Sequence, residues 1–317
     1  MRIAVLTGVA GIAGMFALAA APVFAQTAAR PADDPHAGHA MMDMAQTAPA
    51  VAQAKPDNPA IPPDNGASVD RLKASPRHGE WVDIKMPSGP ALKSFVVYPE
   101  RKDKAPVVLV IHDIFGMGDW ARAVGDSLAK EGFIAIVPDL LSGKGPNGGG
   151  TEELGQGVGQ AIRTLTPDDV NARLNAAKAY GASLPAANGK TAVIGFCWGG
   201  SGSINYAVAQ PELSASVIYY GTPPMKTVDG KQVVDSDLLA KIKAPVIGFY
   251  GGNDARVTST VEPTAAEMKK LGKIYEPHVM EGAGHGFLKG QAQNDANAKA
   301  AVDAWPLTIA FLKQHTK

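Results

Sequence analysis

A cysteine between two glycines is the feature of this sequence that points most directly to chemistry. The segment Gly195-Phe196-Cys197-Trp198-Gly199 follows an apolar run and precedes a stretch of helix-forming residues. This G-x-C-x-G pattern in a strand–turn–helix context is typical of a nucleophile elbow with sulfur as the attacking atom. Glycine is needed on both sides because side chains there would collide with the neighbouring strand or helix. The start of the following helix favours the thiolate of Cys197 over the thiol.

A nucleophile of this kind needs a carboxylate and then a histidine later in the chain. Asp254 comes just after the apolar run 245–250, and His285 follows the run 275–280. A histidine held by a carboxylate keeps the tautomer that can take the proton of the nucleophile. Taken singly, the three residues have structural alternatives: a core thiol, a turn cap and a surface histidine. Their order, each after its own strand, favours a catalytic triad of Cys197, Asp254 and His285.

Two backbone N–H groups are expected to bind the oxyanion that forms during attack on a carbonyl. In this arrangement one donor belongs to the residue after the nucleophile and the other to an early strand-to-helix loop. The donors predicted here are Trp198 and Ile114, the latter within the segment 112–116.

The elements that must position these residues are predicted from the hydrophobic pattern. Short, nearly continuous apolar runs, which are typical of buried strands, lie at 106–112, 134–138, 191–196, 215–220, 245–250 and 275–280. Helical patterns lie at 120–131, 167–183, 199–209, 260–271 and 296–314. This alternation predicts an α/β fold with a mostly parallel sheet and helices on both faces. Residues 81–86 and 92–98 predict an opening hairpin, and 141–150 a flexible loop near the ligand site.

From about Trp81 to its end, the chain resembles the dienelactone hydrolase family of carboxymethylenebutenolidase-like proteins. The matching segments are HDIFG at 112–116, PDL at 138–140, GFCWGG at 195–200, YYG at 219–221, GGND at 251–254 and GAGHGF at 282–287. The resemblance implies an α/β-hydrolase fold and Cys197, Asp254 and His285 as the triad. It also implies a carboxylic ester hydrolase that opens an ester or lactone through an acyl-enzyme and needs no cofactor.

The resemblance further implies activating or substrate-binding roles for Asp113 and Lys289. Asp113 stands where the family typically carries a glutamate, one methylene longer, that contacts the resting thiol and helps to activate it. The family archetype grips the substrate carboxylate with arginines, whereas this chain has Lys289 four residues after His285 and Lys144 near Leu140. A lysine attracts a carboxylate but cannot form the planar two-pronged contact of an arginine.

Length and charge favour a single catalytic domain with a small ligand. The 317 residues include 30 basic and 30 acidic side chains, so the net charge is zero. This balance indicates neither nucleic acid nor an anionic membrane surface as a partner, and a small-molecule ester or lactone is the expected one. Cys197 is the single cysteine, which excludes an intrachain disulfide. The oligomeric state is left open, with a monomer as the default.

The N-terminal residues predict export to the periplasm or the medium. Residues 1–25 combine a charged start, an apolar middle and a small-residue end, as in a secretory signal peptide. A membrane anchor is the alternative, but the run is rich in Ala and Gly and ends in a cleavage-like site, so no membrane association is expected after cleavage. Residues 26–75, rich in Ala, Pro and Met, predict a disordered leader. The catalytic domain is then expected at 76–317.

Two imidazoles and three thioethers gather in the leader, at His36, His39, Met41, Met42 and Met44. Such soft ligands suit copper, but a low-complexity spacer without fixed coordination geometry is favoured, so no metal site is assigned.

Two alternatives to an ester or lactone hydrolase remain open. One is another acyl hydrolase, an acyltransferase or a peptidase on the same fold; the other is a non-catalytic metal-handling or binding protein.

Overall fold

A computed structural model of the chain describes residues 57–317, which fall within one compact unit. The predicted signal peptide and the cluster from His36 to Met44 lie outside the described residues. Within 57–317, no helix combines the length and the apolar character needed to cross a membrane.

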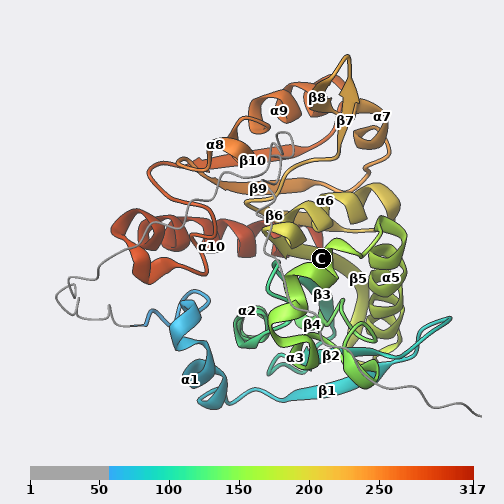
Figure 1. Cartoon of the computed structure of the whole chain (residues 1–317). Helices are drawn as coiled ribbons and strands as arrows, with labels where there is room; N and C mark the ends of the chain where they lie inside the picture. The colour runs from blue at the N-terminus through green and yellow to red at the C-terminus, as the bar shows by residue number, and fades with distance from the viewer. Residues whose placement is uncertain (1–56) are drawn as a thin grey trace, which may run out of the picture. The chain divides into compact units, whose positions relative to one another are not determined.

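The centre of the unit is an eight-stranded sheet (Figure 1). Its strands are β1 (Gly79–Ile84), β2 (Leu92–Val97), β3 (Ala105–Ile111), β4 (Ile134–Pro138), β5 (Ala187–Phe196), β6 (Ala215–Tyr219), β9 (Val246–Gly251) and β10 (Tyr275–Met280). They lie in the order β1-β2-β4-β3-β5-β6-β9-β10. β2 is antiparallel to both β1 and β4, and all other neighbours are parallel. The predicted opening hairpin and mostly parallel sheet are confirmed.

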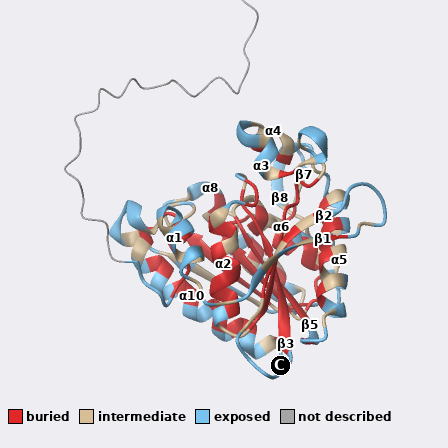
Figure 2. Cartoon of the chain, turned by 90° about the horizontal axis from the view of Figure 1, so that it is seen from below, coloured by how far each residue is buried: buried red, intermediate tan, exposed pale blue. Residues whose placement is uncertain are grey.

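Helices cover both faces of this sheet. They are α2 (Asp119–Lys130), α5 (Pro167–Ser183), α6 (Trp198–Ala209), α9 (Val261–Lys270) and α10 (Asp295–His315). Val108 and Val110 of β3 pack in one core cluster with α2 and α10, whereas Val107, Leu109 and Ile111 pack in the other with α5, α6 and α9. Side chains alternate across a strand, so β3 is buried throughout, as the strands in Figure 2 largely are.

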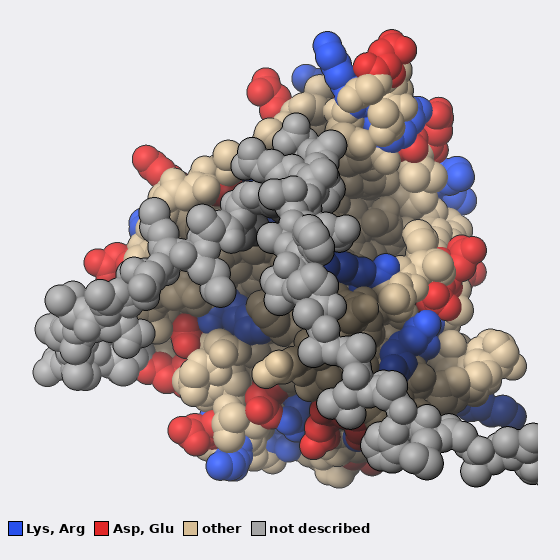
Figure 3. Space-filling view, in the orientation of Figure 1, with Lys and Arg blue, Asp and Glu red and all other residues tan. Residues whose placement is uncertain are grey.

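Several short elements escaped the sequence prediction. They are α3 (Thr151–Leu154), α4 (Val158–Arg163), α7 (Ser236–Leu239), α8 (Ala255–Thr258) and a two-stranded sheet of β7 (Met225–Val228) and β8 (Lys231–Val234). Each is too short to show a hydrophobic period. On the face visible in Figure 3, acidic and basic side chains are interspersed, in keeping with the zero net charge.

The domain begins earlier than the sequence predicted, because residues 57–75 pack on it instead of forming a disordered leader. This segment, which we call the N-terminal strap, contains the 3-10 turn η1 (Asn65–Ala67) and the helix α1 (Ser68–Lys73). Its Ile61 is only 3% exposed and belongs to the core cluster of α2. Composition does not reveal this packing, because the strap buries its few apolar side chains on the domain and needs no core of its own.

Candidate active site

Cys197 lies at the sharp turn between β5 and α6, in a backbone conformation that is rare for a residue with a side chain. Its φ is 58°, and its N–H donates to Tyr219 O at 3.0 Å. A Cβ on Gly195 would lie 1.8 Å from Gly199 O, and one on Gly199 would lie 2.4 Å from Ile111 O. Backbone atoms cannot move aside at these distances, so both glycines are required for the turn.

The structure brings the three predicted triad side chains into one chain of contacts. Nε2 of His285 lies 3.0 Å from Sγ of Cys197, and Nδ1 lies 2.5 Å from Oδ2 of Asp254. Asp254 stands at the start of α8 but makes no capping hydrogen bond with its side chain. Its carboxylate is 8% exposed, whereas the His285 ring is 35% exposed. The acid is therefore buried and directed at the imidazole, and the imidazole is open to a ligand.

These contacts raise the pKa of His285 above its ordinary value of 6.5. The hydrogen bond with Cys197 is the largest cause, burial opposes it, and the contact with Asp254 adds to the rise. When Nδ1–H donates to Asp254, Nε2 is left as the acceptor for the thiol proton. The arrangement can thus transfer a proton from sulfur to nitrogen.

Both predicted oxyanion donors are available. Trp198 is the first residue of α6, where a backbone N–H has no partner within the helix. Ile114 lies in the loop after β3, and among the described residues neither N–H donates to a protein acceptor. Both N–H groups are therefore free to donate hydrogen bonds to a ligand oxygen.

His112 holds the loop that carries Ile114, a role that sequence reasoning missed. The ring is fully buried; Nδ1–H donates to Asp113 O at 2.8 Å, and Nε2 accepts from Leu140 N at 3.3 Å. Burial lowers the pKa of His112, so the ring stays neutral and Nε2 stays an acceptor. It also stacks on Trp198, with ring centroids 5.7 Å apart. The available signal was a histidine at the very end of a buried strand.

Asp113 and Lys289 pair with each other. Lys289 Nζ donates to Oδ2 of Asp113 at 2.7 Å, and Phe115 N donates to Oδ1 at 2.9 Å. The predicted contact between Asp113 and the thiol is therefore not formed, because both carboxylate oxygens are engaged on a side chain shorter than glutamate. Lys144 is exposed, and its charge acts on Asp169, so it does not join this pair.

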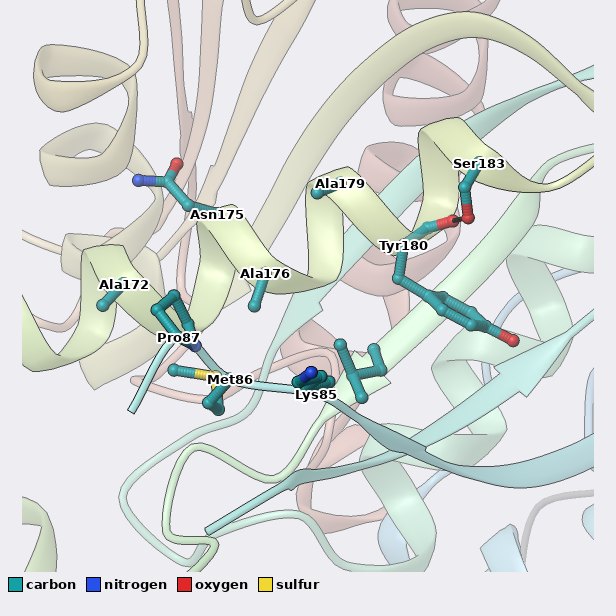
Figure 4. Close-up of a pocket in the computed structure, with 10 residues that line it drawn as sticks. Lys85, Met86, Pro87, Ala172, Asn175, Ala176, Ala179, Tyr180 and Ser183 are labelled. Atoms are coloured by element: carbon teal, nitrogen blue, oxygen red, sulfur yellow. Dashed lines mark hydrogen bonds between the residues drawn. The ribbon is translucent and has the colours of Figure 1, made fainter. Parts of the chain in front are cut away.

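One of two surface pockets adjoins the predicted site residues, and the other does not. A pocket of about 280 Å³ lies between the N-terminal strap, the loop after β3 and the start of α2, and it is bordered by Asp113 and Lys289. A larger one of about 770 Å³ lies between α5 and the turn at 85–87 (Figure 4). Its lining is mostly apolar and includes none of the predicted site residues. The smaller pocket is therefore the one that adjoins the candidate chemistry.

The candidate metal-binding side chains of the N-terminal leader, His36, His39, Met41, Met42 and Met44, all lie outside the described residues. Within 57–317, no group of three or more His, Cys, Asp or Glu side chains is arranged to hold a metal ion.

Comparison with known proteins identifies the family. The model of the dienelactone hydrolase family matches residues 92–316. A protein of Escherichia coli O157:H7, provisionally assigned as a carboxymethylenebutenolidase, is 30% identical over 236 residues, or 72% of this chain and 84% of the relative. One of Yersinia pestis with the same provisional assignment is 27% identical and covers 78% of this chain and 93% of the relative.

Solved structures agree with this assignment. A crystal structure from Klebsiella pneumoniae, provisionally identified as a dienelactone hydrolase, has a TM-score of 0.64 at 26% identity and covers 75% of this chain and 99% of its own. An acylaminoacyl peptidase of Pyrococcus horikoshii, at 17% identity with a TM-score of 0.59 and covering 79% and 44% of the two chains, shares the fold alone. This chain belongs to the dienelactone hydrolase family and is a hydrolase of the ester or lactone type on an α/β-hydrolase fold.

Proposed function

We propose that this protein hydrolyses small esters or lactones through a thioester formed on Cys197. The observation that carries the proposal is the line of contacts from Asp254 to His285 at 2.5 Å and from His285 to Cys197 at 3.0 Å. A buried acid, an imidazole and a nucleophile in hydrogen-bond contact are the components of covalent acyl transfer.

In the first half of the reaction, Nε2 of His285 takes the thiol proton as Sγ of Cys197 bonds to the carbonyl carbon. The carbonyl electrons move to oxygen, which accepts hydrogen bonds from the N–H groups of Ile114 and Trp198. When the electrons return, the bond to the alkoxy oxygen breaks and that oxygen takes the proton from His285. A lactone opens in this step without losing any atoms. The enzyme is left as a thioester.

In the second half, water replaces the alcohol. His285 takes a proton from the water as its oxygen bonds to the thioester carbon, and the same N–H groups bind the oxyanion. The carbon–sulfur bond then breaks, the acid leaves, and the proton returns to Cys197. Asp254 stabilises the imidazolium in both halves and keeps the ring oriented.

Asp113 and Lys289 border the substrate in this proposal. Asp113 is 6% exposed, so drawing Lys289 away would leave a buried carboxylate unpaired, which is costly. A substrate carboxylate would meet an ammonium whose charge Asp113 already neutralises, and it would lie close to the Asp113 carboxylate. We therefore expect neutral esters and lactones to be favoured over carboxylated ones such as a dienelactone.

Hydrolysis of a short-chain nitrophenyl ester and of a dienelactone, under reducing conditions, tests the mechanism. We expect Cys197→Ala to lose at least about 10⁴-fold in kcat, because the covalent route is removed. Cys197→Ser keeps a nucleophilic atom but not the thiol, and it serves as the comparison. Mass spectrometry of the acid-quenched protein should show the added acyl mass on wild type and not on Cys197→Ala. Equal rates for all three proteins would disprove the triad and favour a binding protein.

Residues 1–25 support export as part of this proposal. N-terminal sequencing of protein recovered from the periplasm or medium should begin at Gln26. Protein that retains Met1 and stays in the cytosolic fraction would contradict export without affecting the proposed chemistry.

A further inference from the structure

The N-terminal strap is tied to the loop that carries His285 and Lys289. Asn65 N donates to Lys289 O at 2.9 Å, and Ala292 N donates to Oδ2 of Asp64 at 3.0 Å. Backbone groups of both segments take part, so the loop and the strap fix one another. The strap therefore lies at the edge of the candidate active site.

The same segment is anchored on α2 and cross-linked within itself. Trp120 Nε1–H donates to Pro63 O at 3.0 Å, and the side chain of Ile61 is buried beside it. Arg71 donates through Nε to Oδ2 of Asp57 at 2.7 Å. Figures 1 and 2 both show α1 beside α2. The strap is thus a fixed wall, and it lies wholly upstream of the residues that match the family model.

That wall encloses one side of the 280 Å³ pocket. Asn65 and Val69 of the strap face it, together with Phe115, Asp113 and Lys289. Phe115 is 70% exposed, so its ring is open to contact with a ligand. The volume of about 280 Å³ is close to the lower end of the range for small-molecule sites, about 300 Å³, and is large enough for one ring.

The charges around the pocket are already neutralised. The ammonium of Lys289 is bonded to Asp113 and lies 4.8 Å from the ring centre of Phe115 and 5.5 Å from that of Trp120. Its side chain is 25% exposed. An uncharged flat group can bury the Phe115 ring beside this pair, whereas an anion would meet no net positive charge and would lie close to the Asp113 carboxylate.

Two residues that line the pocket adjoin the candidate machinery in the chain. Asp113 directly precedes the predicted oxyanion donor Ile114, and Lys289 lies four residues after His285. We propose that this pocket, built with the N-terminal strap, is the subsite for a neutral, ring-sized group of the substrate, and that Val69 and Asn65 determine specificity. The proposal rests on the proposed function and adds its substrate class.

Filling the pocket tests the proposal. Val69→Trp places a large ring in the wall, and Val302→Trp on α10 is the matched control, because both valines are helical and exposed, at 40% and 46%. The measured quantity is the ratio of kcat/KM for phenyl acetate to that for ethyl acetate. Comparing this ratio between proteins cancels the difference in leaving-group reactivity. We expect Val69→Trp to lower it at least about tenfold, chiefly through KM, and Val302→Trp to leave it unchanged.

A second variant keeps the test valid if Val69→Trp does not fold. Val69→Ala enlarges the pocket and should raise the relative rate of naphthyl acetate over phenyl acetate, with an unchanged melting temperature. If neither variant changes its ratio while both stay folded, the subsite is disproved. Cys197→Ala is assayed in parallel, since its full activity would instead refute the proposed function.

The preference for an uncharged substrate group is tested separately, with a neutral and a carboxylated ester. Wild type should hydrolyse phenyl acetate better than 4-acetoxybenzoate, the same ester with a carboxylate on the ring. A preference for the carboxylated ester that disappears in Lys289→Ala would overturn the neutral class.

Discussion

His285 Nε2 lies 3.0 Å from Cys197 Sγ, although 88 residues separate them in the chain. Cys197 follows β5 and His285 follows β10, and two further strands lie between these in the sheet. Because parallel strands end at the same edge, the loops after them can meet across that distance. The contact has a measurable consequence for the acidity of the imidazole.

The pH profile of kcat/KM should show an acidic limb with its midpoint above 6.5. His285 must be unprotonated at Nε2 to accept the thiol proton, and its pKa is raised above 6.5 by Cys197 and by Asp254. Asp254→Asn removes one of these causes, so the midpoint should move to lower pH while the rate falls by about 10⁴-fold. Stopped assays from about pH 5 to about pH 9 measure both. A wild-type midpoint at or below 6.5 would contradict the prediction.

Two glycines near the nucleophile should respond oppositely to alanine. At Gly195 a Cβ would lie 1.8 Å from Gly199 O, so Gly195→Ala should lower the free energy of unfolding by about 4 kcal/mol or more. At Gly202, inside α6, a Cβ would meet only Ile111 side-chain atoms at 3.5 Å. Gly202→Ala should therefore stabilise the protein by about 0.5–1 kcal/mol through helix propensity. Urea unfolding distinguishes them, and equal effects would show that the turn tolerates a side chain.

Adjacent buried tyrosines offer a second matched pair. The hydroxyl of Tyr219 lies 2.7 Å from Thr308 Oγ1, whereas that of Tyr220 is buried with no partner among the described residues. Tyr219→Phe should cost about 1 kcal/mol of stability, and Tyr220→Phe should leave it unchanged or higher. The melting temperatures of the two variants give the comparison. Destabilisation by Tyr220→Phe would reveal an acceptor outside the protein atoms.

The junction between the N-terminal strap and the sheet depends on a buried ion pair. Arg77 donates through Nε and Nη2 to Asp126 at 2.8 and 2.6 Å, and Asp126 is 3% exposed. Arg77→Ala leaves that carboxylate unpaired and should cost about 3 kcal/mol. Lys299→Ala, which removes the partner of Asp303 on the surface, should cost less than about 0.5 kcal/mol. Similar midpoints of urea unfolding for the two variants would argue against the buried pair.

Local features of the chain were predictable because their causes lie within a few residues. The helix α5 begins and ends where the sequence indicated, since Thr166 caps its start and Pro167 fits the first turn. The turn at Cys197 was predictable for the same reason, because steric demands on its flanking glycines act between near neighbours.

Tertiary structure alone decided the contacts between distant side chains. Lys289 pairs with Asp113 across 176 residues, and no local pattern encodes that distance. The strap could not be recognised from its composition, which is too poor in apolar residues to form a core, because Ile61 packs into a core built by α2 and the sheet. The sequence by itself determined which groups could do chemistry and in what order they occur. Packing decided which charges neutralise one another and which segment closes the pocket, since both depend on surfaces that exist only once the sheet has formed.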